Sequence, residues 1–292
     1  MSDPRFPRIG LVSKPRLDGV SDELALAVQR LTDAGSKVLL DTEAAELLDA
    51  TGLSSMPRER LAGEVDLLIV LGGDGTLLSV APAAAAAGTP VFGVNYGGMG
   101  FITPTPRSSL VEAIEKLLGG QTRTSRRHLL RAEVLDGNGA RRTRRDVLND
   151  AVLNKTDLAR IVELTVTVDD ELVSTFRADG LIVCTATGST AYSLAAGGPI
   201  VMPEIDTIVL TPICPHTLTN RPLALPGDAV VRIRQETPDQ EVFLSLDGQE
   251  GIALTAADTV HIRRSPNVLQ LLQPVPTSYF EVLRAKLHWG SQ

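Results

Sequence analysis

The chain has 292 residues, of which 43% are hydrophobic and 22% charged, and its formal net charge at pH 7 is −7. This balance is typical of a globular protein with a sizeable core, and the acidic charge argues against nucleic acid as a partner. No apolar run approaches the roughly 20 residues of a membrane span, and the first residues lack a signal peptide's apolar run, so we expect a cytoplasmic protein.

The numbers and spacing of cysteines and histidines are typical of a cytoplasmic protein without a zinc site. The two cysteines, Cys184 and Cys214, do not have metal-ligand spacing, and a secreted disulfide framework would normally contain more of them. The four histidines are scattered, at positions 128, 216, 261 and 288. We therefore predict no zinc cluster and no dedicated metal site built from protein ligands.

Up to about residue 120, strand-like and helix-like segments alternate. Short apolar runs predict strands at 8–13, 37–41, 65–71 and 90–95. Helices are predicted after an N-cap at Ser21, in the alanine-rich segment from Leu77, and over 110–118, which Gly119 and Gly120 close. The alternation predicts an α/β domain with a parallel sheet over residues 1–122.

From about residue 123 the apolar residues recur with a period of two, as at Val162, Leu164 and Val166, which predicts an antiparallel, sandwich-like all-β domain over 123–273. Residues 136–139 and 169–170 have the composition of hairpin turns. One helix is expected here, from near Gly188 to Ala196. The amphipathic segment 279–289, within a C-terminal stretch 274–292, is expected to pack back on the body.

A short basic run lies among strand-like residues: Arg141, Arg142, Arg144 and Arg145. It is interpreted either as a solvated face of a strand, which we favour, or as a local patch facing phosphate.

The sequence Gly72-Gly73-Asp74-Gly75-Thr76 follows a buried strand and precedes a helix. Glycines let the backbone approach a ligand closely, and a helix N-terminus attracts phosphate. A hairpin turn is the alternative, but the residues that follow are helical. The sequence is not a Walker A loop, because no Gly-Lys-Ser/Thr follows.

Asp74 is the candidate catalytic residue of this turn. A carboxylate beside phosphates is unfavourable unless it binds a metal or moves a proton, and phosphoryl transfer to a hydroxyl needs a group that orients or deprotonates the nucleophile. The alternative role is a turn residue that caps the next helix, and both roles are compatible.

Three further segments carry candidate site residues. Residues 95–101 form a second glycine-rich turn after a strand, for which structural and functional interpretations are equally good. Asn149 and Asp150 are adjacent polar residues inside an apolar run, so they lie at a strand end or bind a ligand. In 179–192 a buried strand enters a Thr/Ser/Gly turn and then a helix, where hydroxyls and N–H groups can hold a sugar or amide, and Tyr192 can border a base.

With these motifs in place, the chain resembles the bacterial NAD kinase family over nearly its whole length. The GGDGT turn is shared with diacylglycerol and sphingosine kinases. The decisive motifs are later: the segment at 179–200 is similar to the family's NAD-binding signature, and 211–223 and Asp247-Gly248-Gln249 are also similar to the family.

The resemblance implies the roles of individual residues. Asp74 would activate the 2′-hydroxyl of the adenosine ribose of NAD, and the donor phosphates would lie against Gly72, Gly73, Gly75 and Thr76. Asn149 and Asp150 would hold the adenosine, and Asp179 would contact the nicotinamide-ribose side, in some cases from a neighbouring subunit. The remaining implied NAD-binding residues are Thr187, Thr190, Ala191, Tyr192 and Gln249, with Asn95, Arg177 and His216 as further candidates; His216 is equally well a structural histidine.

The family also implies ATP as phosphoryl donor, a divalent metal, usually Mg²⁺, and a homodimer or homotetramer. Two departures stand out: the family usually has Glu where this chain has Asp150, which shortens the reach of the carboxylate, and often has Pro where this chain has Ala186.

Two alternatives remain at this point. One is a lipid or sugar kinase that shares the 72–76 turn, and the other is a regulator that binds NAD(H) without turnover. The sequence leaves open whether ATP or polyphosphate is preferred, whether NADH is accepted, whether NADP(H) inhibits, and the size of the oligomer.

Overall fold

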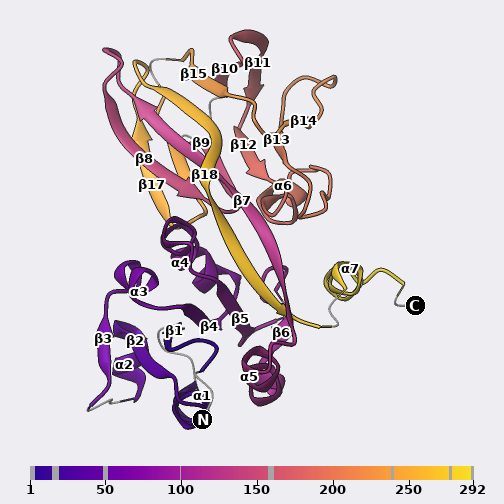
Figure 1. Cartoon of the computed structure of the whole chain (residues 1–292). Helices are drawn as coiled ribbons and strands as arrows, with labels where there is room; N and C mark the ends of the chain where they lie inside the picture. The colour runs from indigo at the N-terminus through magenta and orange to yellow at the C-terminus, as the bar shows by residue number, and fades with distance from the viewer. Residues whose placement is uncertain are drawn as a thin grey trace. The chain divides into compact units, whose positions relative to one another are not determined.

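The computed structural model describes residues 4–14, 20–48, 52–98, 100–156, 161–237, 240–275 and 278–290. The chain divides into two compact units (Figure 1), one of Met1–Arg126 with Val268–Gln292 and one of Arg127–Asn267. Two long strands, β7 (Thr122–Leu135) and β18 (Thr259–Pro274), have residues in both.

The first unit is an α/β domain with a parallel sheet, as the sequence predicts. Its strands follow the order β5-β4-β1-β2-β3, and the end of β18 and the short β6 (Thr105–Pro106) pair with β5 in parallel. The bounds are β1 Arg8–Ser13, β2 Lys37–Asp41, β3 Ser54–Met56, β4 Leu67–Gly72 and β5 Val91–Asn95. Every residue of β4 and of β5 is buried, which explains their unbroken apolar runs.

The helices before residue 119 contact strands of this sheet, and a last helix follows it near the C-terminus. The bounds are α1 Val20–Asp33, α2 Thr42–Leu48, α3 Arg58–Glu64, α4 Asp74–Ala87, the 3₁₀ turn η1 Arg107–Ser109, α5 Leu110–Leu118 and α7 Tyr279–Leu287. Apolar residues of α1 and α5 share one core cluster with alternate strand residues such as Leu11 and Ile69. Helices α3 and α4 lie against each other (Figure 1) and also contact the strands. Helix α7 buries Val282 and Leu283.

The predicted start of α1 is wrong by a short distance. The helix begins at Val20, so Ser21 lies inside its first turn and is not its N-cap. Val20 is fully buried in the same stripe as Leu24, Ala27 and Leu31. The buried stripe therefore extends the helix one residue before the serine.

The second unit is an antiparallel β domain. One sheet of six strands follows the order β14-β13-β12-β9-β16-β17, and a second set pairs in the order β11-β10-β15-β18, with β7 joining β18 to β8. The bounds are β8 Arg141–Val147, β9 Asp150–Lys155, β10 Val162–Val168, β11 Glu171–Ala178, β12 Gly180–Thr185, β13 Thr207–Ile213, β14 Leu223–Pro226, β15 Val231–Gln235, β16 Val242–Leu246 and β17 Glu250–Leu254. Leu164, Ile233 and Leu181 belong to one core cluster that both sets of strands share, as in a sandwich.

Both predicted hairpin turns are confirmed. The Asp136 carboxylate accepts hydrogen bonds from the N–H groups of Asn138 and Ala140, each at 2.9 Å, between β7 and β8. Asp169 and Asp170 join β10 to β11 with positive φ values of 49° and 71°. Such values fit the primed turns of tight hairpins.

The single helix expected from Gly188 to Ala196 is wrong in detail. The segment forms a 3₁₀ turn, η2 (Gly188–Thr190), and then one α-helical turn, α6 (Tyr192–Ala195). Ala191 separates them with a non-helical ψ of −130°. The hydroxyls of Ser189 and Thr190 bond to backbone carbonyls three residues earlier, which favours a short turn over a continuous helix.

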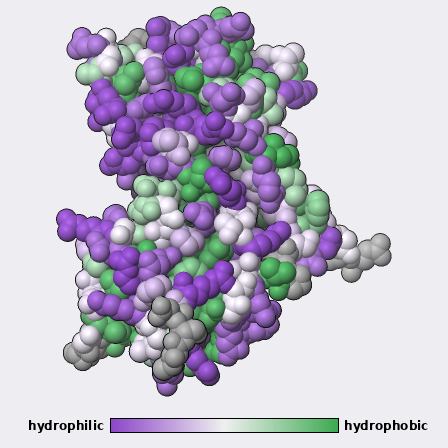
Figure 2. Space-filling model, viewed as in Figure 1, coloured by the Kyte–Doolittle hydropathy of each residue, from purple (hydrophilic) through white to green (hydrophobic). Residues whose placement is uncertain are grey.

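Within the described residues, no helix is long and apolar enough to cross a membrane. Hydrophilic side chains gather over β7 and β8 on the face shown in Figure 2.

The basic run forms part of this hydrophilic face. Its residues lie on β8, where Arg141 pairs with Glu133, Arg142 with Asp258 and Arg145 with Glu250. These ion pairs and the exposure of the arginines support the interpretation as a solvated face of a strand.

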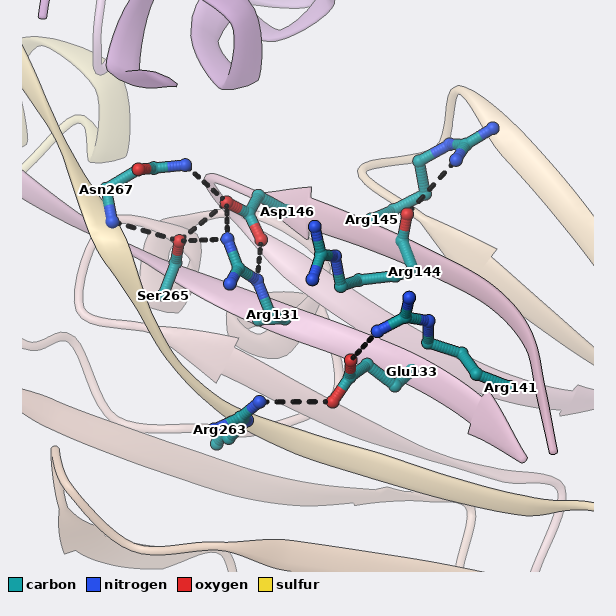
Figure 3. Close-up of polar contacts among 9 residues, drawn as sticks. All are labelled: Arg131, Glu133, Arg141, Arg144, Arg145, Asp146, Arg263, Ser265 and Asn267. Carbon is teal, nitrogen blue, oxygen red and sulfur yellow. Dashed lines mark hydrogen bonds and ion pairs between the residues drawn. The ribbon is translucent and has the colours of Figure 1, made fainter. Parts of the chain in front are cut away.

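A second polar cluster ties β8 to its neighbours (Figure 3). Asp146 on β8 accepts hydrogen bonds from Arg131 on β7 and from Ser265 and Asn267 on β18. Burial raises the pKa of Asp146, but these hydrogen bonds outweigh burial and leave the pKa below its usual value.

Candidate active site

The glycine-rich turn joins strand β4 to the N-terminus of helix α4 in the first unit. Strand β4 ends at Gly72, Gly73 is the N-cap of α4, and Asp74 is the first residue of that 14-residue helix. The positive end of the helix dipole therefore points at this turn. The helix starts before its predicted beginning at Leu77, so Thr76 lies in its first turn, with its hydroxyl packed over the Cα of Gly72. A methyl group on Gly73 or Gly75 would meet no atom within 4 Å outside the adjacent backbone, so there is open space beside the turn.

The Asp74 carboxylate is held by a second loop rather than by its own helix. Its Oδ2 accepts the N–H of Phe101 at 2.9 Å, and its Oδ1 accepts the N–H of Thr103 at 3.0 Å and the hydroxyl of Thr103 at 2.6 Å. Hydrogen bonds to a charged group are each worth about 1.5–3 kcal/mol. These bonds fix where the carboxylate points, and they do not cap α4.

Asn95 supports this loop. Only 4% of it is exposed, its Nδ2 donates to the carbonyl and hydroxyl oxygens of Thr103, and its Oδ1 accepts the N–H of Gly97. All of these bonds are internal, so the structural interpretation of Asn95 is the one that the contacts favour. Met99 of the same predicted turn lies outside the described residues.

In the second unit, Asn149 lies in a bend before strand β9, and Asp150 is the first residue of that strand. The carboxylate of Asp247, far away in the sequence, holds this bend. Asp247 accepts three backbone hydrogen bonds, from Leu148 at 2.7 Å, Asn149 at 2.7 Å and Asp150 at 3.0 Å. The N–H of Asp247 in turn donates to the carbonyl of Asp150. Asp247 was not among the predicted site residues. A signal existed, since Asp-Gly after an apolar strand favours a turn with positive φ, and Asp247 has a φ of 50°.

Asp150 is a buried carboxylate with an unusual environment. It is 6% exposed, and none of the described residues donates a hydrogen bond to its side chain. Burial, with the nearby charge of Asp247, raises the pKa of Asp150 to about 7. Burial likewise raises the pKa of Asp247 to about 6, although its three backbone hydrogen bonds act in the opposite direction. A ligand hydroxyl placed at Asp150 would supply the donor that the protein does not.

Ionisation of Asp150 should therefore make the unfolding free energy of the protein depend on pH. Because the pKa of Asp150 is raised in the folded protein, its stabilising contribution to the unfolding free energy is fully present below pH 4. That contribution is lost as the pH rises through about 7. As the pH rises from 5 to 8, we expect the unfolding free energy of Asp150→Asn to increase by about 2–4 kcal/mol relative to that of the parent. Urea unfolding of the ligand-free proteins at both pH values measures this difference.

Asp146→Asn is the matched control. The pKa of Asp146 is lowered, so its stabilising contribution is complete above its unfolded pKa and constant between pH 5 and 8. This variant should lose similar stability at both pH values. Parallel pH dependences for Asp150→Asn and the parent would contradict the assignment.

The turn after β12 packs directly on the Asn149-Asp150 bend. Thr185 donates its hydroxyl to the carbonyl of Leu148 at 2.6 Å and accepts the N–H of Gly188 at 3.0 Å. Gly188 lies against the backbone of Asn149, where an added Cβ would be 2.5 Å from the Asn149 carbonyl carbon. The structure thus brings together two segments that the sequence singled out separately.

The other implied NAD-binding residues divide into two groups. Thr187 and Thr190 are buried in this turn, with Ala191 and the 43% exposed Tyr192 following them. Arg127 donates to the hydroxyl of Thr187 at 3.4 Å. Gln249 lies in the β16–β17 turn, two residues after Asp247, and its N–H donates to Leu246.

Asp179 lies elsewhere. It precedes β12, whereas Thr187 follows the other end of the same six-residue strand, so about 17 Å of strand separates them. Lys155 pairs with Asp179 at 2.6 Å, Arg177 pairs with Glu163 at 3.1 Å, and the N–H of His216 donates to the carbonyl of Arg177. Arg177, Asp179 and His216 therefore form a group of their own.

No three His, Cys, Asp or Glu side chains converge as metal ligands in the part of the chain that the structure describes.

Comparison with known proteins decides the family. Residues 9–122 match the ATP-NAD kinase N-terminal domain, and residues 148–273 match the ATP-NAD kinase C-terminal domain. The chain belongs to the ATP-NAD kinase family. It is therefore a phosphotransferase, as the motifs predicted.

Curated relatives extend this match to the full length of the kinase. The chain is 42% identical to a NAD kinase of Solibacter usitatus over 289 residues, covering 99% of this chain and all of the relative. It is 48% identical to a NAD kinase of Syntrophotalea carbinolica over 238 residues, covering 82% and 83% of the two chains. Neither the matched domains nor these relatives favour a lipid or sugar kinase or a non-catalytic regulator.

Solved structures of NAD kinases share the fold. A yeast NADH kinase complexed with NADH superimposes with a TM-score of 0.90 at 24% identity, covering 99% of this chain and 89% of that one. A NAD kinase from Archaeoglobus fulgidus in complex with ATP superimposes with a TM-score of 0.76 at 23% identity, covering 96% and 98%.

Proposed function

We propose that this kinase transfers the terminal phosphoryl group of ATP to the 2′-hydroxyl of the adenosine ribose of NAD, giving NADP. The observation that carries the proposal is the Asp74 carboxylate, which three hydrogen bonds from residues 101–103 hold at the N-terminus of α4. A carboxylate held in one orientation is suited to accept the proton of an attacking hydroxyl.

The donor phosphates would lie against Gly72, Gly73, Gly75 and Thr76. The open space beside Gly73 and Gly75 and the positive end of the α4 dipole support this role. Transfer would then depend mostly on positioning of donor and acceptor and on neutralising charge.

A divalent metal, Mg²⁺ by expectation, fits this chemistry as a companion of the donor. Mg²⁺ is usually held by substrate phosphates, waters and one or two carboxylates rather than by an all-protein cage. The described residues offer no cluster of three acidic or histidine ligands, and Asp74 is the one carboxylate within the turn. The donor phosphates would hold the ion, which when bound neutralises their negative charge.

NAD would be held by the second group of residues. Asn149 and Asp150 would bind the adenosine, with the Asp150 carboxylate accepting from a ribose hydroxyl in place of the hydrogen bonds it lacks. Thr187, Thr190, Ala191, Tyr192 and Gln249 would line the rest of the NAD site, in the turn after β12 and the β16–β17 turn.

Asp179 would contact the nicotinamide ribose of NAD bound to a neighbouring subunit, in a cytoplasmic homodimer or homotetramer. Its separation from Thr187 along β12 supports a contribution in trans. Arg177 and His216, which accompany Asp179, would lie near that contact.

Incubation of the purified protein with Mg²⁺ and NAD tests the proposal, with ATP, GTP or polyphosphate as donor in separate reactions. An NADP-specific dehydrogenase detects the product. We expect NADP with ATP. NADP with polyphosphate alone would keep the acceptor and change the donor, and no NADP with any donor, despite measurable NAD binding, would refute the proposed reaction.

A further inference from the structure

A chain of side-chain hydrogen bonds runs from the end of β5 to the first residue of α4. It links Asn95, Thr103 and Asp74, of which Thr103 is fully buried and Asn95 is 4% exposed. Sequence motifs contain the two ends of this chain, Asn95 and Asp74, but not Thr103 in its middle. The links are 2.9 Å from Asn95 Nδ2 to Thr103 Oγ1 and 2.6 Å from Thr103 Oγ1 to Asp74 Oδ1.

The direction of every bond in the chain is fixed. Asn95 Oδ1 accepts the N–H of Gly97, so the other end of the amide is the donor. The Thr103 hydroxyl therefore accepts from Asn95, and its single proton goes to Asp74, since an ionised carboxylate can only accept.

The two carboxylate oxygens of Asp74 consequently differ. Oδ1 receives two donors, the N–H and the hydroxyl of Thr103, while Oδ2 receives one, the N–H of Phe101. A carboxylate oxygen offers about two acceptor positions. Oδ1 is therefore saturated, and Oδ2 retains one position for a further donor.

Close packing preserves this difference. A Cβ added to Gly100 would overlap Asp74 Oδ1 and would lie 2.7 Å from Asp74 Cγ. The methyl group of Thr103 fills the space beside Gly93 in the same way, because a Cβ there would lie 2.7 Å from it. The carboxylate thus has little freedom to exchange its two oxygens by rotation.

We propose that Thr103 is a positioning residue which, by occupying Oδ1, leaves Oδ2 of Asp74 as the atom that takes the proton of the attacking hydroxyl. The proposal rests on the proposed function, since it refines the role of Asp74 in that reaction. It adds that Asn95 acts one step further back, by orienting the hydroxyl of Thr103.

Thr103→Val tests this proposal, because valine keeps the shape and the backbone N–H and replaces the hydroxyl with a methyl group. We expect kcat to fall about 10- to 100-fold, as for loss of a hydrogen bond to a charged group, while KM for NAD changes less than threefold. Thr103→Ser should restore kcat to within about threefold of the parent. A purely structural role would instead lower thermal stability without this split between kcat and KM.

Thr105→Val is the matched control. Thr105 is 6% exposed, two residues further along, and its hydroxyl makes no hydrogen bond with a described residue. This variant should leave kcat within twofold of the parent. If Thr103→Val fails to fold, the pair Thr103→Ser and Thr103→Ala, which differ only by the hydroxyl, gives the same comparison.

The outcomes separate the two proposals. A kcat for Thr103→Val within twofold of the parent, or equal kcat values for the Ser and Ala variants, would overturn the role of Thr103 while NADP formation by the parent stands. Absence of NADP formation by the parent itself would instead refute the proposed function.

Discussion

Asp74→Asn is expected to lower kcat for NADP formation by about a hundred- to ten-thousandfold. The amide cannot accept the proton of the attacking hydroxyl, whereas the backbone of the turn and the α4 dipole remain to bind the donor. Binding of NAD should persist, because Asn149, Asp150 and the turn after β12 are unchanged. Coupled NADP detection measures kcat, and calorimetry measures NAD affinity.

Because Asp74 accepts several hydrogen bonds, the stability of Asp74→Asn must be measured together with its kcat. In either orientation, the new NH₂ group faces a donor, Phe101 N–H on one side or the two donors of Thr103 on the other. A buried donor left unpaired costs about 1–3 kcal/mol. Thermal unfolding must therefore show that the variant is folded at the assay temperature.

Asp136→Asn provides the comparison for this substitution. Asp136 also accepts two backbone N–H groups, but in the exposed β7–β8 turn. It should keep full activity. Unchanged turnover in Asp74→Asn, in protein shown to be folded, would remove Asp74 from the role of base.

Gly188→Ala is expected to destabilise the second unit by about 3 kcal/mol or more and to raise KM for NAD at least tenfold. The added methyl group would lie 2.5 Å from the carbonyl carbon and 2.8 Å from the Cα of Asn149. Backbone atoms cannot turn aside as a side chain can, so β9 and the turn after β12 must separate. Urea unfolding and NAD-dependent kinetics measure the two effects.

Gly251→Ala is the matched glycine substitution. A Cβ at Gly251 would lie 3.4 Å from the ring of Phe243, an ordinary van der Waals contact, in strand β17. Its stability should stay within about 1 kcal/mol of the parent. Equal unfolding midpoints for the two alanine variants would show that the bend at Asn149 tolerates displacement.

Apolar patterns in the sequence predicted strands correctly where burial alone determines the element. The apolar runs of β1 and β2 gave both strands with their observed bounds, because every residue of each strand after the first is buried in the parallel sheet. The helix expected at 188–196 failed because side-chain hydroxyls bond the backbone of a turn whose sequence resembles a helix start.

The supporting residues of the candidate site could not be predicted in this way. Thr103 is 29 residues from Asp74, and Asp247 is 97 residues from Asp150, so no periodicity or spacing connects them. The sequence identified residues with unusual chemistry, such as Asp74 and Asp150. It did not identify the residues that fix their orientation, since that depends on long-range packing.

The buried carboxylate of Asp150 should also affect the measured enthalpy of ligand binding. Because burial raises its pKa to about 7, Asp150 is partly protonated in the empty protein at neutral pH. A ligand that donates hydroxyl hydrogens to it favours the anion, so binding at pH 7 will release a fraction of a proton to the solvent. The calorimetric enthalpy of NAD binding will then vary with the ionisation enthalpy of the buffer.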